Sequence, residues 1–354
     1  MSTDPNNPLN DLAYANEATG CKALYRQQAE HFQVVETLNF KPSGEGEHLY
    51  LYIKKSNTNT DWLARDLARR ANLNPLDVGY AGRKDRLAVT TQWFSLLDPQ
   101  HRQTSTKMSF ETQFKSDDFS IIQTSRHNKK LRKGEIAFNR FKLQLLAFEG
   151  CIDTLTERVK LLSRVGFPNY FGPQRFGHDG SNIANAQAML SGKIRVKDRN
   201  KRSIYLSSAR SYLFNKILSA RIQENTWQTP IDGDCFWDNQ TQQLSEIASI
   251  ENLSESELYE SLNSGNLTIT GAMAGDGNNL SSGLCNELES RVLNSQADLY
   301  KGIANSRINW QRRPLRVIPS DVNCSKNDTG VELNFSLQTG AYATSLLREL
   351  ITIL

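Results

Sequence analysis

Apolar and polar residues alternate along several stretches of the first 150 residues, and this pattern predicts β-strands. Residues 31–54 hold two such stretches, separated by the turn sequence PSGEG. Strand character returns in residues 79–96, from Ile121 onward, and in the segment NRFKLQLLAF that begins at Asn139. The segment VELNFSLQ repeats the pattern near the C-terminus, so both ends of the chain share strand character.

Helical spacing of apolar residues predicts two helices before residue 166 and several after it. Thr60 or Asp61 is the expected N-cap of the first helix, and Asp153 is the expected N-cap of the second. From 166 to 317 the pattern is mainly helical. We therefore predict an α+β fold in which residues 1–165 and 318–354 form one discontinuous domain around a mixed or antiparallel sheet. Residues 166–317 would form an inserted, mainly helical domain.

Composition limits the function classes further. The 354 residues include 42 basic and 38 acidic side chains, a net charge of +4, so a basic surface must come from local clustering. Two cationic runs cluster in this way, at 126–133 and at 194–202. The five cysteines lack C-x-x-C spacing, which argues against a disulfide framework and a zinc site. Neither a signal peptide nor a membrane-spanning run is evident, so we expect a cytoplasmic protein with no membrane association.

The segment GYAGRKDRLAVTTQWFSL, from Gly79, places one carboxylate among three cations. Asp85 is flanked by Arg83, Lys84 and Arg86, which would keep it ionised and would also suit a phosphate backbone. Taken alone, the segment is better interpreted as a polar turn with a solvated ion pair. No paired histidines, nucleophile elbow, Walker A loop or dinucleotide fingerprint is present, and this elimination favours a metal-free mechanism without a nucleotide cofactor.

Five blocks in order strengthen the functional interpretation: GYAGRKDRLAVTTQWFSL, RHNKKLRKGEIAFNRFKL, NYFGPQRFG, KDRNKRSIYLSSARSYLFN and TGAYATSLLREL. Together they resemble the tRNA pseudouridine synthase D (TruD) family, from about Phe32 to the C-terminal helix. The resemblance implies a pseudouridine synthase catalytic domain with an inserted TRUD domain. It also implies isomerisation of uridine to pseudouridine in tRNA, at uridine 13, with no cofactor and no metal.

The resemblance assigns roles to individual residues. Asp85 falls on the catalytic aspartate, and Phe141 on the aromatic residue that stacks on the target base. Asn139 falls on an amide that helps to place the aspartate or the nucleotide, and Phe32 on a further substrate contact. Tyr342, a further expected substrate contact, stands where close relatives carry phenylalanine, and a stacking role survives that change. Lys84 matches the lysine before the aspartate, and phosphate contacts are expected from Arg83, Arg86, Lys129, Lys130, Arg132 and Lys133.

Several alternatives stay open at this point. The carboxylate of Asp85 could attack C1′ of the ribose, add to C6 of the base, or remove the 2′ proton. A non-catalytic RNA-binding or chaperone protein would use the same basic cleft. An aspartate-dependent hydrolase is less favoured, because it would not explain two basic clusters. The expected partner is tRNA, and a monomer is the default expectation.

Overall fold

The computed structural model describes residues 10–98, 114, 116–245, 250 and 252–354. Their contacts divide into two compact units. The first, here called the sheet unit, contains the described residues of Gly20–Lys160 with Pro319–Gly340 and Ile351–Leu354. The second, here called the helical unit, contains the described residues up to Thr19, Leu161–Ile318 and Ala341–Leu350.

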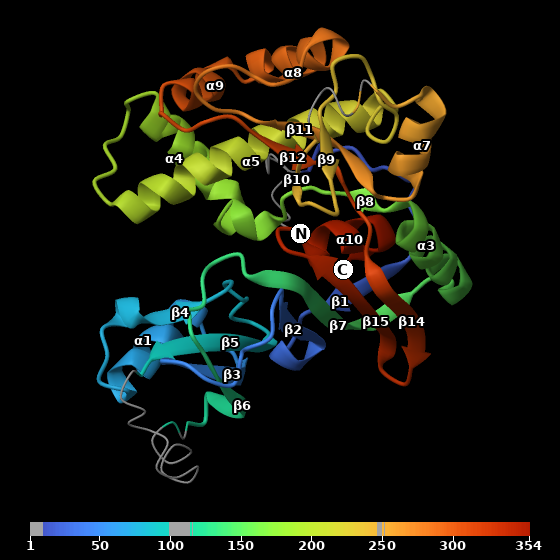
Figure 1. The fold of residues 1–354 in the computed structure, drawn as a ribbon. Helices are drawn as coiled ribbons and strands as arrows, with labels where there is room; N and C mark the ends of the chain where they lie inside the picture. The colour runs from blue at the N-terminus through green and yellow to red at the C-terminus, as the bar shows by residue number, and fades with distance from the viewer. Residues whose placement is uncertain (1–9, 99–113, 115, 246–249, 251) are drawn as a thin grey trace. The chain divides into compact units, whose positions relative to one another are not determined.

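A ten-stranded mixed sheet forms the sheet unit, and strands from both ends of the chain contribute to it (Figure 1). The strand order is β14–β15–β7–β2–β5–β3–β6, with β4 paired to β5 and β1 paired to β7 and β16. The β2–β5 pair is parallel, and antiparallel pairs flank it. The α+β prediction is therefore confirmed. The strands are β1 (Lys22–Tyr25), β2 (Phe32–Leu38), β3 (His48–Ser56), β4 (Val78–Tyr80), β5 (Val89–Leu97), β6 (Phe119–His127), β7 (Ile136–Glu149), β14 (Ser320–Asn327), β15 (Gly330–Gln338) and β16 (Thr352–Ile353).

Helix α1 (Thr60–Arg70) covers part of one face of this sheet with Leu63 and Leu67. Its N-cap is Asn59, whose side chain accepts hydrogen bonds from two backbone amides of the first turn. The predicted N-caps Thr60 and Asp61 are therefore wrong. Helix α3 (Ile152–Val165) likewise contains Asp153 in its first turn instead of using it as N-cap. Two short 3₁₀ helices, η1 (Ala29–His31) and η2 (Pro75–Asp77), also belong to the described part of this unit.

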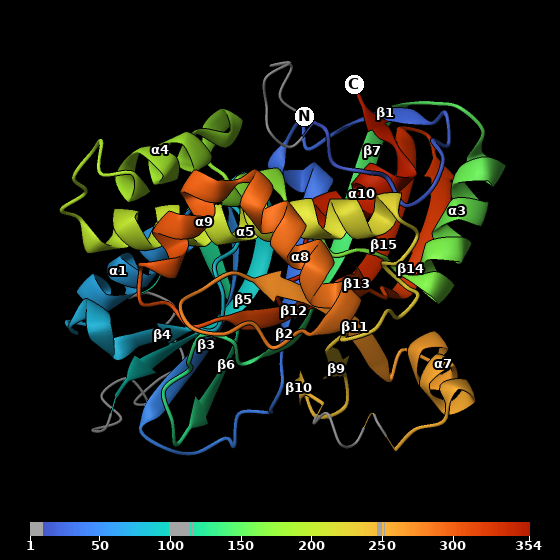
Figure 2. The same ribbon diagram turned by 90° about the horizontal axis from the view of Figure 1, so that it is seen from above.

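The helical unit is built around α5 (Arg199–Gln223), against which α4 (Ser181–Leu190), α8 (Gly283–Ser295) and α9 (Ala297–Ala304) lie (Figure 2). The helical prediction for 166–317 missed a four-stranded sheet, β10–β9–β11–β12. Its strands are short and follow one another irregularly, so their alternation is weak. They are β9 (Phe236–Asp238), β10 (Gln243–Leu244), β11 (Leu267–Met273) and β12 (Gln311–Pro314), and the remaining elements are β8 (Phe167–Pro168), β13 (Arg316–Val317), η3 (Pro173–Arg175), η4 (His178–Gly180), α7 (Glu255–Asn263) and α10 (Ala343–Leu350).

Contacts at the two chain ends place the division differently from the predicted boundaries. Helix α10 belongs to the helical unit, where Ser345 Oγ donates a hydrogen bond to the Tyr170 carbonyl at 2.7 Å. Arg348 donates to the Ala13 carbonyl at 2.8 Å, which ties the N-terminal segment to α10. These are side-chain to backbone contacts between distant segments, which periodicity does not reveal.

No described helix, including the 25 residues of α5, is long and apolar enough to cross a membrane.

Candidate active site

The loop that carries Asp85, residues 81–88 between β4 and β5, is held in place by polar side chains from neighbouring elements. Thr60, at the start of α1, accepts a hydrogen bond from the Lys84 amide at 3.0 Å. Gln92 of β5 donates to the Gly82 carbonyl at 2.9 Å and accepts from the Thr60 hydroxyl at 3.1 Å. Because Thr60 and Gln92 are fully buried, these hydrogen bonds are shielded from water and hold the loop firmly.

The cation beside Asp85 is Arg26, which follows β1. Its Nη2 lies 3.3 Å from Asp85 Oδ2, and its Nε donates to the Leu87 carbonyl at 2.8 Å. Asp85 Oδ1 receives no hydrogen bond from the part of the chain that the structure describes. One oxygen is therefore oriented by a guanidinium while the other keeps its lone pairs for a ligand. The Asp85 side chain is 31% exposed, so a ligand can reach it.

The cations adjacent to Asp85 in sequence point elsewhere, and the prediction that they surround its carboxylate is wrong. Successive side chains of the extended loop point in different directions, so each finds its own partner. Arg83 pairs with Asp61 at 3.0 Å, Lys84 pairs with Glu36, and Arg86 donates to the Asn57 carbonyl at 3.4 Å.

Arg26 also has an unusual backbone conformation. Its φ is 59°, in the left-handed region that costs a residue with a Cβ about 1–2 kcal/mol. Its guanidinium lies 4.9 Å from the ring centroid of Phe32, within cation–π range. Strain of this kind gathers at functional sites, where surrounding contacts maintain it. Arg26 carries no signal in the sequence, since nothing local distinguishes an arginine that follows a short strand.

Three phenylalanine rings cluster on one face of the ten-stranded sheet. Phe141 of β7 is paired in register with Val34 of β2 and with Phe335 of β15, so the three residues share a face. The Phe141 ring stacks on Phe335 at 5.1 Å and meets Phe32 edge-to-face at 6.0 Å. Phe32 and Phe141 are both buried, at 3% and 8% exposure. Phe141 therefore contributes to packing whatever else it does.

Asn139 precedes Phe141 by two positions on β7 and so lies on the same face. In register it stands between Glu36 and Leu337. Its side-chain Oδ1 is buried and accepts no hydrogen bond from the described residues. A buried amide oxygen without a hydrogen-bond donor lowers the free energy of unfolding by about 1–3 kcal/mol. A bound molecule with an N–H or O–H group would supply that donor.

Lys84 is almost inaccessible to a ligand. Its side chain is 7% exposed and its ammonium pairs with Glu36, which is fully buried. Glu36 also accepts from the Trp93 amide at 3.2 Å. Burial raises the pKa of Glu36 above its ordinary value, and the attraction of Lys84 opposes that rise. The structure therefore places Lys84 beneath the loop, where it supports Asp85 instead of facing solvent.

A second buried lysine lies beneath the same loop. Lys55 of β3 is 1% exposed, and its ammonium donates to the Thr58 carbonyl at 2.6 Å and to the Asp85 carbonyl at 3.5 Å. Burial lowers the pKa of Lys55 to about 8, the charge of Lys84 contributes to that fall, and Asp85 opposes it. The sequence does not distinguish Lys55 from its neighbour Lys54. The two lysines are adjacent on β3, and only the structure shows that Lys55 is buried while Lys54 is exposed on the opposite face.

Most of the first cationic run lies in residues 128–135, the loop between β6 and β7, here called the basic loop. The Gly134 amide donates to the Ala81 carbonyl at 2.9 Å, which joins this loop to the Asp85 loop. Lys129, Arg132 and Lys133 are exposed, and no ion pair to them is found among the described residues. Lys130 differs, because its ammonium donates to the Leu76 carbonyl.

Tyr342, the remaining predicted substrate contact, belongs to the helical unit. Its hydroxyl accepts a hydrogen bond from Arg175 Nε at 3.0 Å, and its ring meets Phe171 edge-to-face at 5.7 Å. The hydroxyl that distinguishes tyrosine from phenylalanine thus holds Arg175 in place. Across the described residues, no three histidine, cysteine, aspartate or glutamate side chains gather as metal ligands would.

The architecture and the site define an α+β protein with a guanidinium-paired carboxylate on a loop held by buried hydrogen bonds. The arginine of that pair also contacts Phe32, one of the clustered aromatic rings Phe32, Phe141 and Phe335. The sequence profile of the family "tRNA pseudouridine synthase D (TruD)" matches residues 9–195 and 181–350. The chain therefore belongs to the tRNA pseudouridine synthase D family.

Similar proteins agree with this assignment. The chain is 37% identical to a tRNA pseudouridine synthase D of Methylococcus capsulatus, over 99% of this chain and 97% of that protein. It is 40% identical to one of Aeromonas hydrophila, over 97% and 94% of the two chains. A crystal structure described as a putative tRNA pseudouridine synthase D of Methanosarcina mazei superposes with a TM-score of 0.69 at 20% identity, covering 96% of this chain and 95% of that one. That likeness concerns the fold.

The pKa of Lys55 predicts a stability change with pH. Because the pKa falls from 10.5 in the unfolded chain to about 8 in the folded one, the unfolded state binds more protons between these values. The free energy of unfolding should therefore rise with pH across this interval, by up to about 3 kcal/mol relative to Lys55→Met. Urea denaturation of both proteins below pH 8 and near pH 10.5 measures the difference. Lys54→Met, on the exposed face, is the control, and parallel pH curves for wild type and Lys55→Met would refute the assignment.

Proposed function

We propose that this protein isomerises uridine to pseudouridine at position 13 of tRNA, with Asp85 as the catalytic residue. The observation that carries the proposal is the Asp85 carboxylate itself. One of its oxygens is held by Arg26, the other is unengaged by the described residues, and the loop beneath is held by buried polar contacts. The names of the family and of its similar members supply the substrate class.

The chemistry suits a carboxylate without a cofactor. Isomerisation breaks the N1–C1′ bond, turns the base and forms a C5–C1′ bond. The C5 hydrogen leaves as a proton, and N1 takes up a proton from solvent, so the atoms balance. No other group enters from outside, so no further donor or acceptor is needed. A carboxylate can attack C1′, add to C6 or remove the 2′ proton and then leave again. In each case Arg26 would orient Oδ2 and leave Oδ1 to react.

The cluster of aromatic rings that includes Phe32 and Phe141 would hold the target base. An enzyme that acts on a base must take it out of its stack, and a flat aromatic ring compensates for the stacking given up. Phe141 would offer the ring, with Phe32 beside it, and Asn139 Oδ1 would accept a hydrogen bond from a uracil N–H. Lys84 would act through Glu36 by positioning the loop. The substrate contact expected of Tyr342 stays a prediction.

Exposed cations would bind the RNA backbone. Lys129, Arg132 and Lys133 are exposed on the loop that is hydrogen-bonded to the Asp85 loop. Arg86 is exposed as well, whereas the charge of Arg83 is already balanced by Asp61. Phosphates near the target nucleotide would therefore bind the unpaired cations of the basic loop in preference to Arg83.

Substitution of the carboxylate tests catalysis directly. Asp85→Asn should lower release of tritium from C5-tritiated uridine in tRNA by about 10²–10⁴-fold, because the amide is neither a nucleophile nor a base at neutral pH. Binding of tRNA should change little. Asp117→Asn, which removes an exposed aspartate from the same unit, is the matched control. Full release by Asp85→Asn would support the competing RNA-binding or chaperone function. A tRNA with cytidine at position 13 should release no label, and release from it would place the target elsewhere.

Phe141 can be tested for stacking separately from packing. Phe141→Leu keeps most of the buried volume but removes the ring, and we expect turnover to fall about tenfold with the fold retained. Phe335→Leu is the control, because Phe335 is fully buried and stacks on Phe141. If both variants lose activity only in proportion to stability, measured by thermal unfolding, Phe141 has a core role alone.

Charge reversal on the basic loop tests RNA binding. Glutamate at Lys129, Arg132 and Lys133 together should weaken tRNA binding and flatten its dependence on salt, by about 0.7–0.9 in log–log slope for each phosphate that the variant ceases to bind. Affinity measured across a salt series gives both quantities. Reversal of Lys22, Lys54 and Lys326, which are exposed elsewhere on the sheet unit, is the matched control. If the two triple variants change the affinity and the salt slope equally, the basic loop has no specific role in RNA binding and is an ordinary solvated surface.

A further inference from the structure

A pocket of about 400 Å³ opens along the N-terminal half of α5 in the helical unit. Three arginines line it, Arg199, Arg202 and Arg210, together with two serines. Leu206, Met273 and Ile308 supply its apolar surface. The lining contains no aspartate or glutamate among the described residues. The pocket therefore combines a concentrated positive charge with an apolar wall.

Arg210 is the deepest charge in this pocket. It is 9% exposed, its Nε donates to the Ala274 carbonyl at 2.7 Å, and its Nη2 donates to the carbonyls of Met273 and Asn309 at 3.1 and 3.0 Å. No carboxylate lies within ion-pair distance of it in the described part of the chain, and Nη1 donates no hydrogen bond there. Burial accordingly lowers the pKa of Arg210 below its ordinary value. A buried cation without a counter-ion is costly, and an anion would relieve that cost.

The first turn of α5 adds to the positive field. A helix N-terminus favours acidic residues, because the backbone amides there carry partial positive charge. Helix α7 follows this rule with Glu255 and Glu257. Helix α5 carries Arg199 and Arg202 in its first turn, and its acidic residue is the N-cap Asp198, whose carboxylate accepts hydrogen bonds from the Asn200 and Lys201 amides. The described residues show no ion pair between Asp198 and either arginine, so both guanidinium groups stay available to a ligand.

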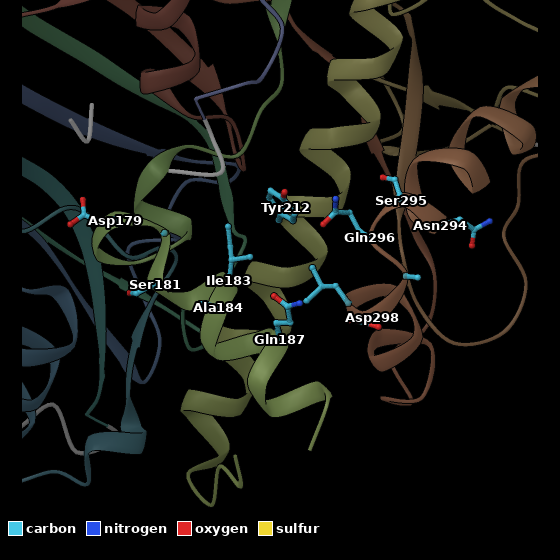
Figure 3. A pocket seen from close by; sticks show the side chains of 13 residues that line it. Asp179, Ser181, Ile183, Ala184, Gln187, Tyr212, Asn294, Ser295, Gln296 and Asp298 are labelled. Atoms are coloured by element: carbon cyan, nitrogen blue, oxygen red, sulfur yellow. The ribbon is translucent and has the colours of Figure 1, made fainter. Parts of the chain in front are cut away.

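The positive charge of the arginine-lined pocket is not shared by a neighbouring cavity. A second cavity, of about 580 Å³, lies between α4, α5 and the junction of α8 and α9 (Figure 3). Asp179 and Asp298 contribute the charged groups of its lining, with amides such as Gln187 and, among the described residues, no lysine or arginine. Both cavities adjoin α5, yet of the two it is the arginine-lined one that offers sites for an anion.

We propose that the arginine-lined pocket binds a backbone phosphate of the RNA substrate, with the attached ribose against Leu206 and Met273. Guanidinium groups match phosphate geometry and hold it by charge-assisted hydrogen bonds. Arg199 and Arg202 are exposed and can close on the phosphate, while Arg210 supplies a fixed charge below them. This inference rests on the proposed function for the identity of the RNA, and it assigns the second cationic run a role in holding that RNA.

The test uses the full chain with Arg199→Ala and Arg202→Ala combined. Both side chains are exposed, so the fold should persist. The Kd for tRNA should rise about tenfold and the salt slope should fall by about 1 for each phosphate that the variant ceases to bind, while kcat at saturating tRNA is retained. Arg164→Ala with Lys301→Ala removes two exposed charges outside the pocket and is the matched control. Equal Kd values for the two double variants would overturn the proposal.

A second arm separates an RNA phosphate from a small free anion. Inorganic phosphate at constant ionic strength should compete with tRNA weakly, and less in the pocket variant than in the wild type. Thermal stabilisation of the wild type by inorganic phosphate, with unchanged tRNA affinity in the variant, would identify a small-anion site and overturn the proposal. Absence of tritium release by the wild type would instead refute the proposed function. The Kd comparison and the phosphate competition measure binding alone, so their outcomes can be distinguished from that failure.

Discussion

The ammonium of Lys84 and the carboxylate of Glu36 form an ion pair with almost no exposure to solvent, and the loop that carries Asp85 is built upon it. Removing one partner of such a pair leaves an uncompensated buried charge and costs about 3–5 kcal/mol. Glu36 lies on β2 and also accepts from the Trp93 amide of β5, so the pair connects the central parallel strands to the loop. With Lys84 turned inward, the next side chain, Asp85, points to Arg26.

Two kinds of cation can now be distinguished in a chain whose net charge is only +4. Lys55 and Lys84 are buried and support the backbone of the Asp85 loop. Lys129, Arg132 and Lys133 remain exposed on the adjoining loop. The RKDR sequence therefore does not act as a single basic patch. Its charges are divided between holding the fold and meeting solvent, and burial decides which residue does which.

The helical unit shows the same division among its arginines. Arg221 is paired with Asp234 and Arg312 with Glu289, each at 2.8 Å and each almost fully buried. Arg210 is buried as well but has carbonyl oxygens as partners, and it lines a cavity. Arg316 is also buried with carbonyl partners, those of Val165 and Leu262. The absence of a carboxylate partner is therefore shared, and it is the place of Arg210 in the wall of a cavity that carries the proposal.

Local sequence determined the α+β class and most of the longer strands, because alternation and turn residues act over a few positions. It also singled out Asp85, whose catalytic role stays a prediction. It also placed Asn139 and Phe141 on one face, since side chains two apart on a strand point the same way. Only the tertiary structure decided that Arg26 accompanies Asp85 and that the neighbouring cations of Asp85 are engaged elsewhere. The small sheet within the helical unit was likewise beyond local pattern. Partners of charged side chains are set by pairing between segments far apart in sequence, and periodicity carries no information about that pairing.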